Sequence, residues 1–157
     1  MQKNKLKSLI HFHFIVFIFG FTAILGSLIS IDSLSLVWYR MSIAFVVLLI
    51  LSIFLRINIF VSKLLLLKML FAGVLIALHW ITFFKAIKVS NVSITLSVLS
   101  LGAFFTSFLE PFFYKRKIIK YEVVLGVIVV IGMSLIFRSQ LYYLEGIIYA
   151  LISVFLS

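Results

Sequence analysis

The residues best suited to chemistry in this chain are ionisable side chains set inside long apolar runs. The stretch FTSFLEPFFYKRKIIK, residues 105–120, places Glu110 and Pro111 among phenylalanines and then supplies four cations within six residues. Glu110 either pairs with these cations or projects inward as a gate or proton carrier. Pro111 removes a backbone hydrogen-bond donor and permits a kink. His13 lies as far from the end of its own apolar run as Glu110 does, at three residues. If Glu110 instead meets His13, the pKa values of the pair would suit proton-coupled transport.

A second group of polar residues lies nearer the opposite ends of these runs. Arg40 and His79 are at similar depths in two successive runs, so they can face one another, and Arg40 offers a planar fork for a carboxylate or phosphate. Alternatively, Arg40 extends to the membrane surface beside Trp38 and Tyr39, which act as anchors. The alternative for His79 is an interhelical hydrogen bond that only locks packing.

Hydroxyl side chains form a stripe along another apolar run. Ser93, Ser97 and Ser100 are spaced by four and three residues, which places them on one face of a helix. Such a stripe lines either a helix contact or a polar cavity, because hydroxyls also join helices to one another in lipid. The candidate substrate-binding or translocation residues are therefore His13, Arg40, His79, Ser97, Ser100 and Glu110, together with Trp80, which directly follows His79.

The composition indicates that these side chains are positioned by membrane helices. The chain is 65% hydrophobic and 11% charged, whereas soluble domains have roughly 45–50% apolar and about 25% charged residues. Apolar runs of about 20 residues follow one another, which matches a hydrocarbon layer of ~30 Å. The runs are continuous rather than alternating, and only helices satisfy their own backbone hydrogen bonds in lipid. We therefore predict an all-α integral membrane protein.

The fourteen cations predict the orientation of this protein. They occur in short clusters between apolar runs, the pattern produced by membrane topology, so nucleic acid is not expected as a partner. Ten lie on one side of the predicted spans and four on the other, which places the N-terminus in the cytoplasm. The predicted spans are residues 10–29, 34–55, 64–84, 92–113 and 121–137, followed by an incomplete sixth run that begins near Tyr142.

The last run is short. From Gly146 to Leu156, a helix would rise about 16 Å at 1.5 Å per residue, roughly half of a hydrocarbon core. A terminus at that depth would leave unpaired carbonyls in lipid. We therefore expect the sequence to be a fragment of a longer chain. Residues 10–137 would form a first five-helix repeat, and residues 142–157 the truncated start of a second.

Several stretches occur in a characteristic order. WYRMSIAFVVLLIL opens with an arginine followed by small and apolar residues, and LHWITFFKAIKVSNVSITLSVLSLGAFFTSFLEPFF joins an aromatic-rich helix end to a Ser/Thr-bearing helix. LGVIVVIGMSLIF contains glycines, and LEGIIYALISVFLS follows it. From about Phe12 to the end, the chain resembles the EamA-type permeases of the drug/metabolite transporter superfamily. It departs from that pattern at Gly102, where the family often has proline, and at Lys115 and Arg116, where it often has a Gly-Glu pair.

The resemblance implies a ten-helix transporter of small metabolites such as amino acids, built from two five-helix repeats and working by alternating access. A duplicated unit with an odd number of spans re-enters the membrane inverted, which is the plan of many secondary transporters with a substrate site between the halves. The expected partners are a small-molecule substrate, the lipid bilayer of the inner or plasma membrane, and a second five-helix repeat. No cofactor and no enzymatic activity are expected.

Two alternatives belong to other classes. A half-size, five-span protein could act as a homodimeric transporter or scaffold. A membrane-embedded lipid enzyme is disfavoured because the four acidic residues fall in four different regions, and no G-x-S-x-G or H-E-x-x-H motif occurs. His11 and His13 are two residues apart, so they point about 200° apart on a helix and cannot share a metal ion.

Overall fold

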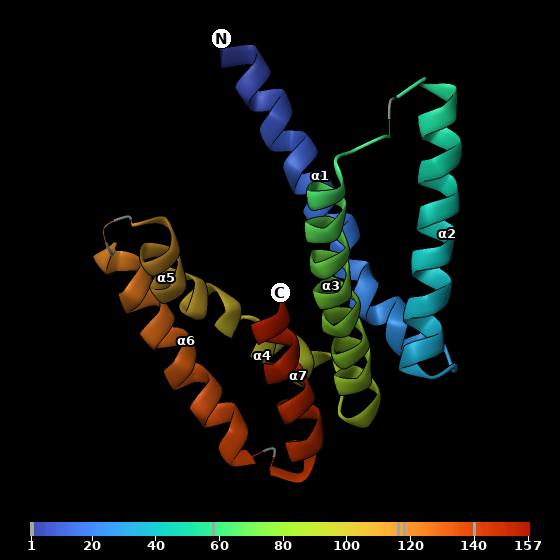
Figure 1. The fold of residues 1–157 in the computed structure, drawn as a ribbon. Helices are drawn as coiled ribbons and strands as arrows, with labels where there is room; N and C mark the ends of the chain where they lie inside the picture. Colours follow the sequence, from blue (N-terminus) through green and yellow to red (C-terminus); the bar gives the residue numbers. More distant parts are fainter. Residues whose placement is uncertain (1, 58, 116, 118, 140) are drawn as a thin grey trace.

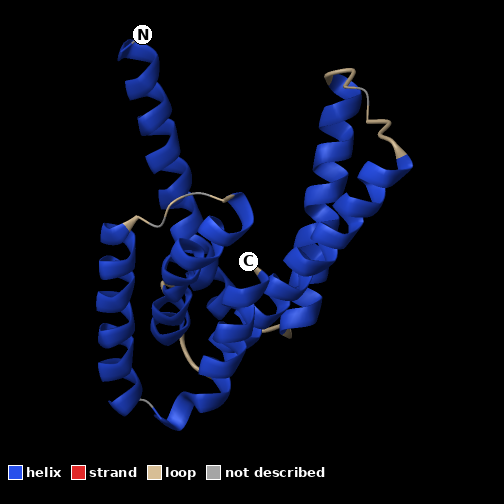
Figure 2. Ribbon diagram, turned by 60° about the vertical axis from the view of Figure 1, so that its left-hand side comes forward, coloured by secondary structure: helices blue, strands red, loops and turns tan. Residues whose placement is uncertain are grey.

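The computed structural model describes residues 2–57, 59–115, 117, 119–139 and 141–157. Every regular element in this part of the chain is a helix (Figure 2), in agreement with the predicted all-α architecture. The elements are α1 (Gln2–Leu28), α2 (Ser33–Phe54), α3 (Lys63–Val89), α4 (Val92–Leu99), α5 (Leu101–Tyr114), α6 (Lys120–Ser139), the short 3-10 helix η1 (Leu141–Tyr143) and α7 (Leu144–Leu156).

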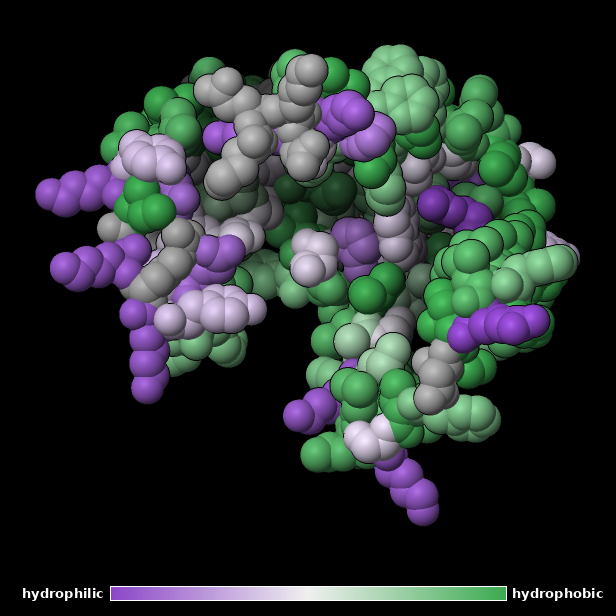
Figure 3. Space-filling view, turned by 90° about the horizontal axis from the view of Figure 1, so that it is seen from above, coloured by the Kyte–Doolittle hydropathy of each residue, from purple (hydrophilic) through white to green (hydrophobic). Residues whose placement is uncertain are grey.

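Successive long segments run in alternating directions (Figure 1). The α2–α3 and α5–α6 connections lie toward the same end of the molecule as the N-terminus, and the α1–α2, α3–α4 and α6–α7 connections lie toward the other. The lysines of the first end include Lys63, Lys115 and Lys117; Arg116 lies outside the described residues. Viewed from this end, hydrophilic side chains project around a largely hydrophobic surface (Figure 3). The basic clusters thus share one end.

Four helical stretches of the described chain are long and apolar enough to cross a membrane. They coincide with the first four predicted spans, and α6 covers the fifth predicted span. Large apolar side chains remain exposed along them, for example Phe17 at 65%, Phe45 at 66% and Phe71 at 68%, as expected for surfaces that face lipid. The four stretches are Lys5–Leu28, Ser33–Phe54, Lys63–Val89 and Val92–Tyr114.

Three of the helices begin at a polar residue whose side chain caps them. A side-chain oxygen at each start accepts a hydrogen bond from the backbone N–H three residues later, which satisfies one of the donors that a helix leaves unpaired at its first turn. In lipid an unpaired donor is costly, so these capping residues help to fix where each span starts. The caps are Asp32 with Ser35 N–H at 3.0 Å, Ser62 with Leu65 N–H at 3.4 Å, and Asn91 with Ile94 N–H at 2.9 Å.

The predicted fourth span is interrupted near its middle. Ser100 separates α4 from α5, and its hydroxyl donates to the Ser97 carbonyl at 2.5 Å. A serine hydroxyl bonded to a carbonyl of the preceding turn competes with the helical backbone bonds and bends the helix. Gly102, which follows the break, is a weak helix former. The interruption is therefore at Ser100, whereas α5 continues through Pro111, the position where the sequence suggested a kink.

Two buried clusters hold the helices together, and α7 is central to one of them. The contact between α7 and α3 is the most extensive of any helix pair in the described chain, and α7 also packs against α4. Its buried residues Ile147, Ala150 and Val154 lie in a cluster with side chains from α3, α4, α5 and α6. The second cluster joins α1, α2 and α3 and consists of Ala23, Leu36, Val37, Phe83, Phe84 and Ile87.

α1 is attached to the rest of the bundle through its carboxyl-terminal part. Ala23 is 2% exposed there, and Gly26 lies so close to the Phe84 ring that no larger residue fits without a shift. Lys88 of α3 donates through Nζ to the carbonyl of Ile29, just after α1, at 2.7 Å. The part of α1 between residues 5 and 20 is exposed. One end of this span is therefore fixed by packing and a hydrogen bond.

Candidate substrate-binding site

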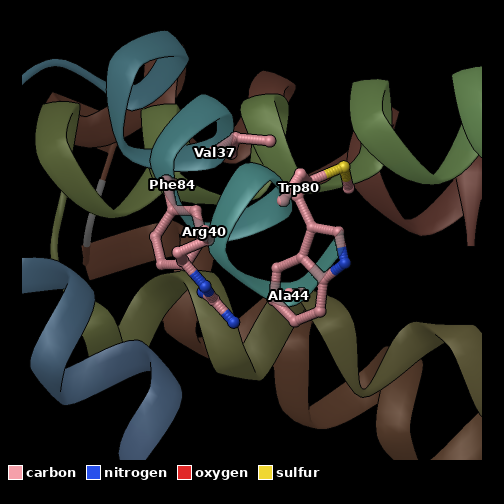
Figure 4. A pocket seen from close by; sticks show the side chains of 6 residues that line it. Val37, Arg40, Ala44, Trp80 and Phe84 are labelled. Atoms are coloured by element: carbon pink, nitrogen blue, oxygen red, sulfur yellow. The ribbon is translucent and has the colours of Figure 1, made fainter. Parts of the chain in front are cut away.

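Arg40 lies on α2 and reaches toward α3, where two aromatic rings meet it. Its guanidinium carbon is 4.8 Å from the Trp80 ring centroid and 4.9 Å from the Phe84 ring centroid. The two rings stack with their centroids 5.7 Å apart and their planes at 23°. Figure 4 shows the guanidinium in the space beside both rings. A cation placed over aromatic faces is attracted by the negative charge of the ring π-systems.

These side chains border a pocket of about 170 Å³ between α2 and α3. The other lining residues, Val37, Met41 and Ala44, are apolar. Within the part of the chain that the structure describes, the Arg40 guanidinium makes no hydrogen bond and no ion pair. Its N–H donors therefore remain for an acceptor that is not part of this chain's described residues.

His79 is one residue before Trp80 but is engaged on another side of α3. Its Nδ1 lies 2.8 Å from the Ser153 carbonyl oxygen and 3.0 Å from the Ser153 hydroxyl, and that hydroxyl donates to the His79 carbonyl at 3.1 Å. Since a carbonyl only accepts, Nδ1 carries a proton in the first bond. The structure thus joins His79 to α7, whereas Arg40 lies beside the ring of Trp80.

The predicted serine stripe is not equally buried along its length. Ser97 is half-buried, and Ser93 and Ser100 are exposed in this chain. The buried hydroxyl-bearing residues of this span are Thr95, which donates to the Asn91 carbonyl at 2.9 Å, and Ser107. Of the stripe residues, Ser93 thus presents its hydroxyl outward from α4 where lipid would not satisfy it, whereas the exposed Ser100 hydroxyl donates to the Ser97 carbonyl.

Glu110 lies at the far end of the same span and borders two pockets. One, of about 430 Å³, is formed between α5 and α6 and also has Thr106, Ser107 and Glu122 in its lining. The other, of about 230 Å³, extends from Glu110 toward the end of α7. Glu110 is half-buried and has interaction partners. Its location is therefore separate from the pocket of Arg40.

His13 lies on the exposed side of α1. Its Nδ1 donates to the Leu9 carbonyl at 2.8 Å, one turn earlier on the same helix, and its ring meets Phe12 edge-on at 5.8 Å. Both contacts are within α1. Among the described residues, no group of three or more His, Cys, Asp or Glu side chains is arranged to hold a metal ion.

The residues that sequence reasoning missed are partners rather than ionisable groups. Phe84 and Met41 complete the pocket of Arg40, and Ser153 completes the bond with His79. Phe84 is four residues after Trp80, so helical spacing places the two rings on one face. Ser153 is the only serine or threonine within α7, and an aliphatic hydroxyl inside an apolar run indicates an interhelical bond.

Comparison with known proteins identifies the family. The profile of the EamA-like transporter family matches residues 7–138, which include most of α1, all of α2 to α5 and nearly all of α6. No curated protein and no solved structure matches the chain significantly. The family profile spans most of the sequence, in agreement with the apolar helices and the polar residues held between them. The chain therefore belongs to the EamA-like transporter family and is a multi-pass membrane transporter.

Proposed function

We propose that this permease moves small metabolites such as amino acids by alternating access, and that its substrate path passes the pocket of Arg40, Trp80 and Phe84. The observation that carries the proposal is an exposed cationic side chain within a span that contacts two aromatic rings at the border of a pocket, with its N–H donors unused by the described chain. Ionisable groups inside membrane spans are costly, and they commonly mark substrate or ion pathways.

A second five-helix unit would complete the cavity. Ser93 and Thr106 are exposed on α4 and α5 in this chain, and their hydroxyls would be poorly accommodated by lipid. Helices of an inverted repeat would cover these positions and place the pocket near the interface of the two halves, where secondary transporters bind their substrates. α7, which packs on α3 and α4, would be the first helix of that unit.

The orientation follows from the distribution of charge. The N-terminus and the two basic connections lie toward one end of the described helices. By the positive-inside rule this end faces the cytoplasm, and the bilayer is the inner or plasma membrane. The polar groups of Arg40 and His79 are then on the half nearer the outer surface, whereas Glu110 and His13 are on the cytoplasmic half.

Transport can be tested with the gene product that contains residues 1–157, purified and reconstituted into vesicles. A mixed pool of metabolites is supplied inside the vesicles, and efflux is followed by mass spectrometry. We expect a small group of solutes to leave faster than from vesicles with Arg40→Gln protein. Equal efflux of every solute from protein-containing and protein-free vesicles would contradict the proposal. The mass of the gene product and the number of subunits per functional unit separate a two-repeat chain from a homodimer of half-size chains.

Alternating access has its own test in the same vesicles. A single cysteine introduced at Ala44, in the wall of the pocket, is labelled by a membrane-impermeant maleimide from outside and then from inside. We expect labelling from each side, with the ratio changed by a transported solute. Labelling from only one side under all conditions would contradict alternating access while leaving the family assignment intact.

A further inference from the structure

On the basis of the proposed function, we infer that the Arg40 pocket binds the carboxylate of a small solute that carries one carboxylate and an apolar substituent. The carboxylate would bind the guanidinium, and the substituent would lie against the apolar wall of the same pocket. Membership of the family does not by itself supply this substrate class. Three features of the site support it: the Arg40 donors that the described chain leaves unused, the charge of the pocket and its lining.

The first observation is the way in which Arg40 is held. Both aromatic rings contact the guanidinium through their faces, at 4.8 and 4.9 Å, and this kind of contact does not use up its N–H donors. The planar guanidinium presents those donors in a fork that matches the two oxygens of a carboxylate. Trp80 and Phe84 therefore position the group while leaving it available for bidentate binding.

The second observation is the charge of the pocket, which favours one negative charge rather than two. Arg40 is the only charged residue in the pocket lining that the structure describes. The two lysines near the end of α3 are engaged elsewhere, since Lys88 donates to the Ile29 carbonyl and Lys85 lies 6.0 Å from the Tyr149 ring centroid. A phosphate dianion would carry a second charge without a partner in low-dielectric surroundings, which is costly. A carboxylate leaves no net charge.

The third observation is the size and lining of the pocket. The pocket is partly open, and its volume of about 170 Å³ is of the same order as the ~150 Å³ of an enclosed apolar cavity that holds a benzene molecule. Val37, Met41 and Ala44 supply aliphatic walls, and methionine adapts to substituents of different shapes. An adjacent apolar pocket shares Val37 and Met41 with it. The space suits a short branched or aromatic substituent.

The test uses Trp80 as the reporter in the full gene product, reconstituted in phosphatidylcholine nanodiscs at pH 7. Trp38, which is 71% exposed, is replaced by Phe, and Trp80 emission is followed in titrations. The probes are 4-methylpentanoate, its neutral analogue 4-methylpentanamide, and inorganic phosphate. We expect a saturable change with the carboxylate, and affinities for the amide and for phosphate at least about tenfold weaker, since a charge-assisted bidentate pair is lost. Equal affinity for acid and amide would overturn the inference.

Variants test the role of the guanidinium. Arg40→Gln should weaken carboxylate binding at least about tenfold and remove the preference for acid over amide, whereas Arg40→Lys should retain a weaker preference because it keeps the charge but not the fork. Arg56→Gln, at the other end of α2 and outside the pocket, is the matched control and should bind as the parent does. If Arg40→Gln does not fold, Arg40→Lys and the acid-to-amide ratio of the parent decide the result.

A lipid headgroup is the other source of an anionic group, and a separate arm distinguishes it. Nanodiscs with about a third phosphatidylglycerol are compared with phosphatidylcholine alone. Unchanged carboxylate affinity supports a solute site. If the anionic lipid itself shifts Trp80 emission in an Arg40-dependent way and displaces the carboxylate, the site is a lipid site and the inference is wrong.

Failure of this inference and failure of the proposed function give different results. Suppose that transport of metabolites is unaffected by Arg40→Gln and extends equally to solutes without a carboxylate. That result would leave the transport proposal standing and reject the substrate class. Arg40-dependent carboxylate binding in a protein that moves no solute would support the site and reject transport by this chain.

Discussion

The Ser153 side chain is fully buried and connects α7 to α3 through a reciprocal pair of hydrogen bonds. His79 donates from Nδ1 to the Ser153 carbonyl, and the Ser153 hydroxyl donates back to the His79 carbonyl. In a membrane such bonds are specific but individually modest in energy. This pair therefore fixes the register of the two helices more than it adds stability.

Ser153→Ala tests that role. It removes the hydroxyl and should lower the free energy of unfolding by roughly 0.5–1.5 kcal/mol, because the His79 carbonyl loses a donor. Thermal unfolding in detergent measures the change. Ser134→Ala is the matched control, since Ser134 is exposed and its hydroxyl bonds only to the Val130 carbonyl of its own helix. An equal loss in both variants would contradict an interhelical role for Ser153.

Asp32, outside the spans, provides a pH-dependent contribution to folding. Hydrogen bonds from the side chain and the backbone amide of Ser35 hold the pKa of the Asp32 carboxyl below its usual value. Because the folded pKa is the lower one, the stabilisation is present above the ordinary carboxyl pKa of about 3.9 and is lost as the pH falls through the folded pKa.

We therefore expect Asp32→Asn to reduce the dependence of the free energy of unfolding on pH below about pH 5. Asparagine still caps α2 but carries no charge. Melting curves across this range, recorded for the parent and the variant, measure the difference. Ser35→Ala, which removes the side-chain hydrogen bond, should act in the same direction. Identical pH profiles in the parent and in Asp32→Asn would show that ionisation of Asp32 makes no contribution to the stability of the fold.

Sequence reasoning at the residue scale identified the unusual groups but not their partners. Arg40 and His79 stand out because ionisable residues inside apolar runs are rare. Their contacts with Phe84 and Ser153 depend on how α2, α3 and α7 are rotated about their axes, which an almost uniformly apolar sequence does not specify. For the same reason, the assignment of His13, Ser97, Ser100 and Glu110 to a translocation path stays a prediction.

At the scale of elements, α3 and α7 have the most extensive contact in the described chain, and they approach closely at Gly146. A Cβ atom at Gly146 would overlap Ser90, the residue that caps the end of α3, with the Ser90 Oγ at 2.5 Å and the Ala86 carbonyl of α3 at 3.2 Å. A small residue at this position lets two backbones approach, a common device in membrane helix packing.

Gly146→Leu should therefore push α7 away from α3 and lower stability by roughly 1–3 kcal/mol, the usual cost of overpacking. The midpoint of thermal unfolding in detergent is the measurement. Gly73→Leu is the matched control, because Gly73 lies on α3 with nothing within 4 Å of the added Cβ. A control variant that loses as much stability as Gly146→Leu would indicate an effect of leucine in general rather than of the helix contact.

The broken fourth span shows where element prediction from sequence falls short. Residues 92–113 read as one continuous apolar run, and proline is the stronger helix breaker by intrinsic preference. The interruption at Ser100 depends on a side-chain bond to the preceding turn, together with packing of α4 against α7. Near the helix end, Pro111 removes a bond without ending α5. Tertiary contacts thus outweigh local propensity here.

At the scale of the whole molecule, the alternating helices predict which connections share a side of the membrane. The chain contains no cysteine, so single cysteines can be introduced and labelled with an impermeant maleimide. Cysteines at Phe60 and Lys117 should be labelled from one side of the membrane, and those at Ser30 and Tyr142 from the other. Labelling of Phe60 and Lys117 positions from opposite sides would overturn the topology.

The overall architecture was the most predictable part of the protein. The length of the apolar runs specifies helices that cross a bilayer, and the positions of charges such as Lys63 and Lys117 separate one span from the next. Both features depend on the free energy of transferring side chains from water to lipid, which is additive along the sequence. The arrangement of the spans around α7 depends on shape at positions such as Gly146 and Ala150, and additive hydropathy contains no information about it.

Because only its carboxyl-terminal end is packed against the bundle, α1 can transmit a small tilt at that end into a larger displacement at its amino-terminal end. Its anchored end is held at Ala23, Gly26 and Ile29, and about 17 residues of rigid helix, from Leu6 to Ala23, extend from that anchor for about 25 Å. A tilt of about 10° at the anchor would displace the far tip by roughly 4 Å, given a rise of 1.5 Å per residue. A small change in side-chain packing beside Phe84, the ring that also contacts Arg40, would thus move the amino-terminal end of α1 by several ångströms near the opposite face of the bilayer.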